Sequence, residues 1–242
     1  MSEYFLRVKS DAAVRPDGPA GRAESYQIKV WTGEKECDIL KGRIKCKEEK
    51  GGLDMGCIPT MEQAQKLLEE YNQDEFHLKH AKIVSGVMGY FAKEYDGENV
   101  EFWKVVGLLH DLDFERYPEQ HCVKSQEIMR EKGLDERIIR ATASHGYQIR
   151  VDIKPEHIME KILYATDELT GLIGAVAAIH PSKSVADLQP KSVKKKFRSP
   201  SFAAGCSRDV IQRGAEMLGW TMDELIGRTL EAMKSLVGTM EI

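Results

Sequence analysis

The spacing of apolar positions changes near residue 58 of this 242-residue chain. Before that point, β-prone stretches at residues 4–8, 26–31 and 39–46 alternate with loops rich in glycine and proline, which is typical of short strands. The charged and then glycine-rich segment Lys47–Gly52 reads as a linker. We therefore predict a small β-rich N-terminal appendage over residues 1–57 and a second domain over residues 58–242.

Downstream of residue 58, apolar residues recur at helical spacing. Thr60 and Gln63 form a capping-box pattern at the start of a helix that reaches about Tyr71. In the next helix, over residues 74–95, the apolar face also carries His80. Similar spacing predicts helices that end at residue 111, over 121–132, 135–145, 155–179 and 208–218, and from residue 221 onward. The second domain is therefore predicted to be all α.

Composition agrees with an ordinary globular protein, at 42% hydrophobic and 31% charged residues with a formal net charge of −4. These values exclude collagen-like, coiled-coil and disordered classes. The longest apolar run, Gly171 to Ile179, is nine residues, against the ~20 that span a bilayer. We expect no membrane contact, and a cytoplasmic protein. Five irregularly spaced cysteines argue against a disulfide scaffold and favour free thiols.

Two acidic positions indicate a bound cation. His110 and Asp111 are adjacent at the end of an apolar helix, where an imidazole and a carboxylate can reach the same ion. Taken alone, the pair is better explained as a capped helix end with a hydrogen-bonded histidine. Asp167 lies within an apolar helix, and burial of its carboxylate is costly unless it is paired or coordinates a metal. The positions one turn away are not basic: Leu163, Tyr164, Thr170 and Gly171.

The histidines and aspartates follow a recognisable order: His80, His110, Asp111, His121, His145 and Asp167. Their local contexts are Leu-Leu-His-Asp-Leu-Asp, Ala-Thr-Ala-Ser-His-Gly and Tyr-Ala-Thr-Asp-Glu-Leu-Thr. This pattern resembles the HD-domain superfamily of metal-dependent phosphohydrolases, and within it the bacterial HDIG-domain proteins, a group with no settled substrate. The resemblance covers residues 58–242 and implies an HD-type helical bundle.

The resemblance also implies a set of metal ligands. The first ion would be held by His80, His110, Asp111 and Asp167. A second ion would be held by His121 and His145, with Asp111 bridging the two. Nitrogen and oxygen donors of this kind suit one or two divalent transition metals, namely Mn, Fe, Co, Ni or Zn. His77, one turn before His80, is an alternative ligand, whereas His157 reads as a solvated residue in the first turn of a helix.

Asp111 and Asp113 are the candidates for catalytic groups. Asp113 stands where the name-giving HDIG pattern often has glycine. Its carboxylate could orient a metal-bound histidine or a metal-bound water, or it could be a surface charge.

A basic segment, residues 183–198, carries six basic residues and one acid. It reads either as a solvated helix face or as an anion-binding rim. In the second interpretation, the substrate phosphate contacts come from Lys183, Lys194 and Arg208. The segment is short and offers few stacking aromatics beyond Phe197 and Phe202, so we do not expect nucleic-acid binding.

These features predict a metal-dependent phosphohydrolase that uses a metal-activated water on a small phosphoester such as a nucleotide. Two alternatives stay open. One is a di-iron oxygenase of the HD superfamily, which uses a similar set of four histidines and two aspartates. The other is a degenerate HD module that binds a nucleotide as a regulator, although such a module would not need an intact ligand set.

Overall fold

The computed structural model describes residues 37–40, 43–46 and 56–240. The chain divides into two compact units, Met1–Trp31 and Thr32–Ile242, and the described residues all belong to the second. Strands β1 (Cys37–Leu40) and β2 (Arg43–Cys46) pair antiparallel and overlap the predicted β-prone stretch, residues 39–46. The other stretches, at residues 4–8 and 26–31, lie outside the described residues. The β-rich appendage and the domain boundary at residue 57 therefore stay predictions.

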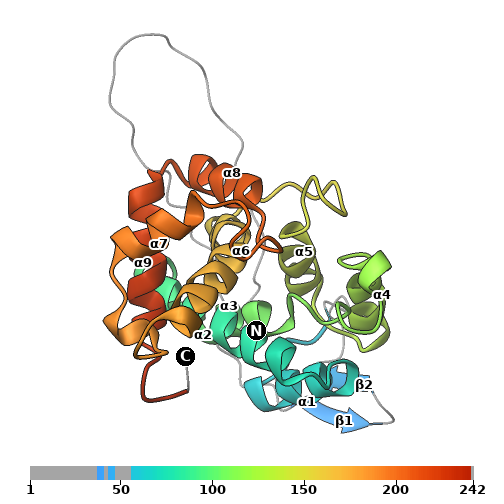
Figure 1. Cartoon of the computed structure of the whole chain (residues 1–242). Coiled ribbons are helices and arrows are strands. Elements are labelled where there is room, and N and C mark those ends of the chain that lie inside the picture. Colours follow the sequence, from blue (N-terminus) through green and yellow to red (C-terminus); the bar gives the residue numbers. More distant parts are fainter. Residues whose placement is uncertain (1–36, 41–42, 47–55, 241–242) are drawn as a thin grey trace. The chain divides into compact units, whose positions relative to one another are not determined.

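The predicted all-α character of the rest of the chain is confirmed by the helices of residues 56–240 (Figure 1). They are α1 (Met61–Tyr71), α2 (Glu75–Tyr95), α3 (Val100–Leu109), α4 (Lys124–Glu131), α5 (Glu136–Ser144), α6 (Ile158–Ile179), α7 (Pro190–Phe197), α8 (Arg208–Leu218) and α9 (Met222–Lys234). Single 3-10 turns at Gly97–Asn99, Pro118–Gln120 and Val185–Asp187 join some of them.

Local capping chemistry sets where two of these helices begin. Thr60 and Gln63 form the predicted capping box of α1, because each side chain pairs with the other's backbone N–H. Helix α6 begins at Ile158, later than predicted, because His157 caps it. The His157 ring accepts from the Met159 N–H, and the Glu160 carboxylate accepts from the His157 N–H. The prediction that His157 is a solvated residue of the first turn is therefore wrong.

Helix α6 packs against α2, α5, α7, α8 and α9. Its buried side chains include Leu163, Leu169, Leu172 and Ile173, and burial of each contributes roughly 1.5–3 kcal/mol. By length and composition alone, α6 is also apolar enough to cross a membrane, contrary to the sequence expectation. Most of that apolar stretch, however, is buried inside the helical body, as in a core helix.

Two glycines let neighbouring helices approach each other closely. A Cβ atom at Gly107 of α3 would lie 2.9 Å from the Ser85 Cα of α2. A Cβ atom at Gly214 of α8 would lie 2.4 Å from the Ala165 Cα of α6. Since carbon atoms do not approach this closely, only glycine permits these crossings.

The cysteines of the helical body differ in state. Cys122 and Cys206 are free thiols, as predicted, but Cys57 is disulfide-bonded. The prediction of free thiols is therefore wrong at Cys57, since spacing along the chain does not reveal which sulfur atoms meet in space.

Candidate metal centre

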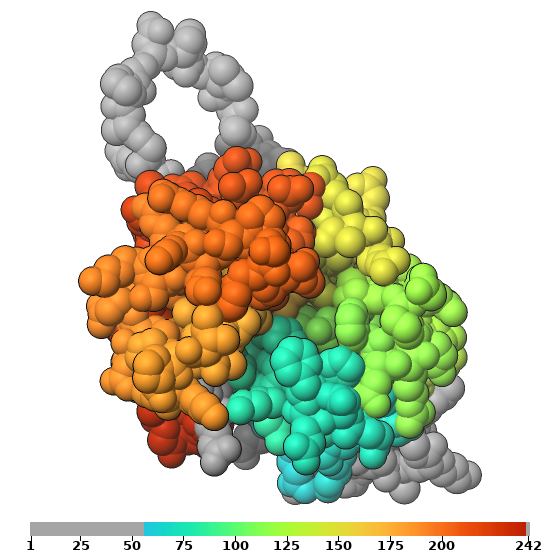
Figure 2. Space-filling model, viewed as in Figure 1, coloured from blue at the N-terminus to red at the C-terminus, as the bar shows by residue number. Residues whose placement is uncertain are grey.

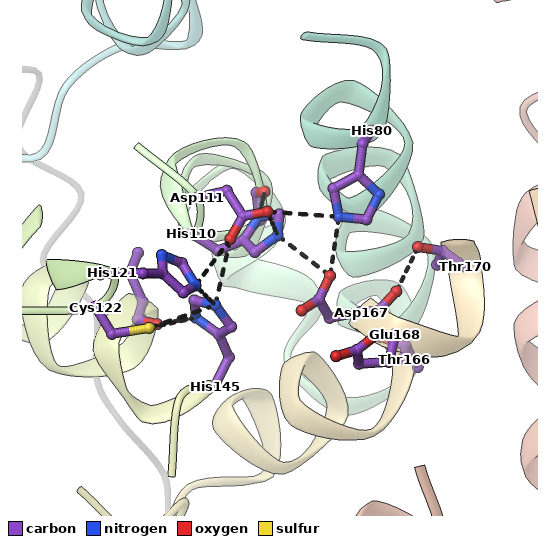
Figure 3. Close-up of polar contacts among 12 residues, drawn as sticks. His80, His110, Asp111, His121, Cys122, His145, Thr166, Asp167, Glu168 and Thr170 are labelled. Atoms are coloured by element: carbon purple, nitrogen blue, oxygen red, sulfur yellow. Dashed lines mark hydrogen bonds and ion pairs between the residues drawn. The ribbon is translucent and has the colours of Figure 1, made fainter. Parts of the chain in front are cut away.

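The six residues predicted to bind metal come together in one cluster (Figure 3). They arrive from four helices and a turn: His80 from α2, His110 and Asp111 from the end of α3, His121 after the turn Pro118–Gln120, His145 at the end of α5, and Asp167 from the middle of α6. Four of them remain partly accessible to solvent, namely His80, Asp111, His121 and Asp167.

One half of the cluster surrounds the Oδ2 atom of Asp111 and the Oδ1 atom of Asp167. His110 Nε2 lies 3.1 Å from Asp111 Oδ2 and 3.2 Å from Asp167 Oδ1. His80 Nε2 lies 2.9 Å from Asp167 Oδ1 and 3.8 Å from Asp111 Oδ2. Ligands at about 2.0–2.2 Å from a shared ion stand roughly 3–3.5 Å apart in a tetrahedral arrangement. These donor atoms are therefore spaced to bind one ion.

The other half surrounds the second carboxylate oxygen of Asp111. Its Oδ1 atom lies 3.4 Å from His121 Nε2 and 3.3 Å from His145 Nε2. The two Nε2 atoms are 3.1 Å apart. The two oxygens of Asp111 therefore face different histidines, so each half of the cluster has one oxygen of this carboxylate among its possible donor atoms.

Hydrogen bonds on the far side of three rings fix which nitrogen faces the cluster. The Nδ1 atoms of His110 and His145 donate to the carbonyls of Gly107 and Thr142. His121 Nδ1 donates to Asp113 Oδ1 at 2.8 Å. A protonated Nδ1 leaves the lone pair of a neutral ring on Nε2, which is the form that binds metal.

Asp113 is fully buried, so the interpretation as a surface charge is wrong. Its Oδ2 atom also accepts from the Ser125 N–H at 2.7 Å. Both oxygens thus support the His121 side of the cluster from behind. The geometry gives Asp113 a positioning role, while Asp111 is the aspartate at the centre.

The surroundings of one buried nitrogen test whether the cluster suits a metal. His110 Nε2 is buried and makes no hydrogen bond of good geometry, although Asp111 Oδ2 and Asp167 Oδ1 lie 3.1 and 3.2 Å away. A buried polar atom whose hydrogen bonding is incomplete costs free energy. A cation between these three atoms would bind all of them, so the residues present fit a metal ion.

The pKa shifts in the metal-free cluster also indicate that these residues suit a cation. Burial disfavours the His110 imidazolium, but Asp111 and Asp167 outweigh it and raise the pKa of His110 to about 10. Burial likewise opposes the charge on His121, but Asp113 raises the pKa of this ring to about 9. Despite burial, His110 lowers the pKa of Asp167 below its usual range. In metal-free protein, the protons on His110 and His121 thus balance the negative charge of the aspartates. A metal ion that binds the same rings must displace these protons.

Two further groups at the cluster were not assigned from sequence. Glu168 follows Asp167 on α6, and its Oε2 atom accepts from the Ser207 N–H at 3.1 Å. Burial, reinforced by Asp167, raises the pKa of Glu168 to about 7.

The second of these groups is Cys122, whose Sγ atom lies 3.6 Å from His145 Nε2. Burial opposes its thiolate form, but His145 and His121 lower the pKa of Cys122 to about 7. In the sequence, Glu168 directly follows Asp167 and Cys122 directly follows His121, and this adjacency could have indicated both groups.

Aromatic side chains lie beside the cluster. The Phe114 ring, 40% exposed, packs edge-on against His121 and His77, with centroids 5.1 and 5.5 Å away. Phe76 is 71% exposed and contacts His77. His77 itself pairs with Glu115 at 3.3 Å, so it does not replace His80 in the cluster. Figure 2 shows a hollow between the teal, green, yellow and orange segments of the chain.

The predicted phosphate contacts have other partners. Lys194 Nζ lies 2.6 Å from an Asp223 oxygen. The guanidinium of Arg208 donates to backbone carbonyls at the end of α7 and in the loop before α8, those of Phe197, Ser199, Phe202, Ala203 and Cys206. Arg208 therefore stabilises this loop, and its contact with phosphate stays a prediction. Lys183 is exposed and has a positive φ of 50°, and it stays a candidate.

Comparisons with protein-family models, curated proteins and solved structures found no match to this chain. The HD-domain assignment therefore remains a resemblance of motifs.

Proposed function

We propose that this protein is a metal-dependent phosphohydrolase of the HD type that acts on a small phosphoester. One observation carries the proposal: the two oxygens of Asp111 face two separate donor groups, with His110 on one side and His121 and His145 on the other. A carboxylate bridging two ions is suited to phosphate ester hydrolysis.

The donor set determines what each residue would contribute. His80, His110, Asp111 and Asp167 would hold one ion, and His121, His145 and Asp111 the other. Bound divalent metal lowers the pKa of a coordinated water toward the physiological range and neutralises charge on phosphoryl oxygens. The chain's own task is to hold the donors in place, through the hydrogen bonds of Gly107, Thr142 and Asp113.

The exposed rings of Phe76 and Phe114 favour a substrate that carries an aromatic ring. Phe114 is in contact with His121 and is also solvent-accessible. Stacking of a base on an aromatic side chain contributes roughly 1–3 kcal/mol. A nucleotide would offer both the phosphate for the metal centre and the base for these rings.

The test is release of inorganic phosphate from a panel of nucleotides and sugar phosphates, with Mn, Co, Ni, Zn or Mg added to metal-free protein. We expect metal-dependent release that is lost in Asp111→Asn. The matched control, Asp187→Asn, removes an exposed carboxylate and should retain activity. No release from any phosphoester by protein that has bound its metal would reject the proposal.

The di-iron oxygenase is the second candidate, because the same four histidines and two aspartates with a bridging carboxylate could bind iron. Protein purified without oxygen would separate the two. An oxygenase would retain iron and consume oxygen with substrate, whereas the proposed hydrolase would not consume oxygen.

A further inference from the structure

We propose that Cys122 is a metal ligand, the thiolate donor of the second ion position beside His121, His145 and Asp111. The inference rests on the proposed metal centre and adds to it a sulfur donor. It makes the two ion positions chemically different, with nitrogen and oxygen donors at the first and a mixed set that includes sulfur at the second.

The position of the sulfur atom is the first observation. Cys122 Sγ lies 3.6 Å from His145 Nε2 and 4.0 Å from its Nδ1. His121, Cys122 and His145 each offer a donor atom, and the three atoms lie within 4.8 Å of one another. In a tetrahedral site with metal–sulfur bonds of about 2.3 Å and metal–nitrogen bonds of about 2.0–2.1 Å, the sulfur and nitrogen atoms stand roughly 3.5 Å apart. The spacing to His145 Nε2 therefore suits a shared ion.

The backbone is the second observation. Cys122 has a φ of +65°, in the left-handed region that residues other than glycine seldom adopt. Residues held in such conformations occur preferentially where the surrounding structure fixes a functional side chain. The strained turn follows His121 directly, and it places the two donors of consecutive residues on the same cluster.

The space for the sulfur atom is the third observation. Gly146 follows His145, and a Cβ atom built on it would lie 2.5 Å from Cys122 Sγ and 3.0 Å from Cys122 Cβ. Any other residue at 146 would displace the thiol. A residue in the left-handed region follows His121, and a glycine that leaves room for its sulfur atom follows His145.

The charge of the second position gives the thiolate a function. His121 and His145 bind metal as neutral rings, and Asp111 is shared with the first ion, so these donors together supply less than one negative charge. A thiolate adds a full charge. Because sulfur is a soft donor, the second position should prefer Zn, Co or Fe to Mg or Mn.

Cobalt titration of the full chain tests the inference, because sulfur bound to Co²⁺ gives a charge-transfer absorption in the near ultraviolet that nitrogen and oxygen donors do not give. We expect the band to appear in the wild type as the second ion binds. In Cys122→Ser, the band should be lost and the second ion should bind at least tenfold more weakly, while the first binds as before. Cys206→Ser, which removes the other free thiol of residues 56–240, should keep the band.

Gly146→Ala is a second variant that retains the Cys122 thiol and displaces it, and we expect it to lose the band as well. It decides the question if Cys122→Ser does not fold. Two bound cobalt ions without the band in the wild type, or a band that persists in Cys122→Ser, would overturn the inference while leaving the metal centre intact. A wild type that binds no cobalt would overturn both.

Discussion

Asp113 accepts a hydrogen bond from the Nδ1 atom of His121, with 2.8 Å between the oxygen and the nitrogen. The other oxygen of Asp113 accepts from the Ser125 N–H. Both oxygens are thus occupied as acceptors, and the side chain is fully buried. A residue so placed controls the orientation and tautomer of His121 without reaching the metal position itself.

This arrangement predicts the effect of Asp113→Asn. His121 and Ser125 donate to different oxygens of Asp113, and an amide has an NH2 group, which cannot accept, in one of these two places. We expect affinity at the second ion position to fall by about 10–100-fold, the usual cost of losing the partner of a metal-bound histidine, with the first position unchanged. Calorimetric metal titration measures both affinities. Equal losses at both positions would point to general distortion instead.

The number of bound ions is the second prediction. His121 belongs only to the group around Asp111 Oδ1, whereas His80 belongs to the group around Asp167. Removal of either ring should therefore empty one position and leave the other. We expect about two equivalents of metal in the wild type and about one in His121→Ala and in His80→Ala, by metal analysis after dialysis. One equivalent in all three proteins would reduce the centre to a single ion.

Much of the centre was predictable from sequence, because its residues stand in short motifs at helix ends. Helical periodicity placed His80 on an inward face, and the cost of a carboxylate in an apolar helix indicated a partner for Asp167. The partners of Arg208 could not be predicted in this way. They are backbone carbonyls, which every residue possesses, so no sequence pattern distinguishes them. His157 was misread for a similar reason, since its capping role depends on the path of the chain into α6.

The pH dependence of metal stabilisation is the third prediction. The raised pKa values of His110 and His121, to about 10 and about 9, keep these rings protonated near neutrality in metal-free protein. Their contribution to metal-free stability is full below the unfolded pKa of about 6.5 and is lost as pH rises through those higher values. Metal requires the neutral rings, so it must displace protons, and its affinity rises with pH.

We therefore expect added Zn or Co to raise the Tm more at about pH 8 than at about pH 6. Thermal unfolding with and without metal measures the difference. In Asp167→Asn the shift should be smaller at both values, since the centre then lacks a carboxylate. A shift that is larger at the lower pH would contradict the assignment of these histidines as ligands.

The fourth prediction separates loop stabilisation from phosphate binding at Arg208. A lysine keeps the charge but cannot reach the carbonyls of Phe202, Ala203 and Cys206 together. We expect Arg208→Lys to lower the free energy of unfolding by at least about 1.5 kcal/mol, the worth of one hydrogen bond to a charged group. Urea denaturation measures it. Lys195→Ala, on an exposed position of α7, should leave stability unchanged. Unchanged stability with a raised KM in Arg208→Lys would support the phosphate-binding role instead.

The last prediction concerns Phe114 and the base of a nucleotide substrate. The Phe114 ring lies against His121 on one edge and is 40% exposed, so a flat ring bound beside the metal centre can stack on it. Phe114→Leu keeps an apolar side chain beside His121 but removes the stacking face. Because stacking contributes roughly 1–3 kcal/mol, kcat/KM for a nucleotide should fall about 5- to 150-fold, whereas kcat/KM for a phosphoester without an aromatic ring should change little. Val123→Leu, on another exposed apolar residue, serves as the control and should leave both values unchanged. Equal losses for the two substrates would mean that Phe114 supports His121 and does not contact the base.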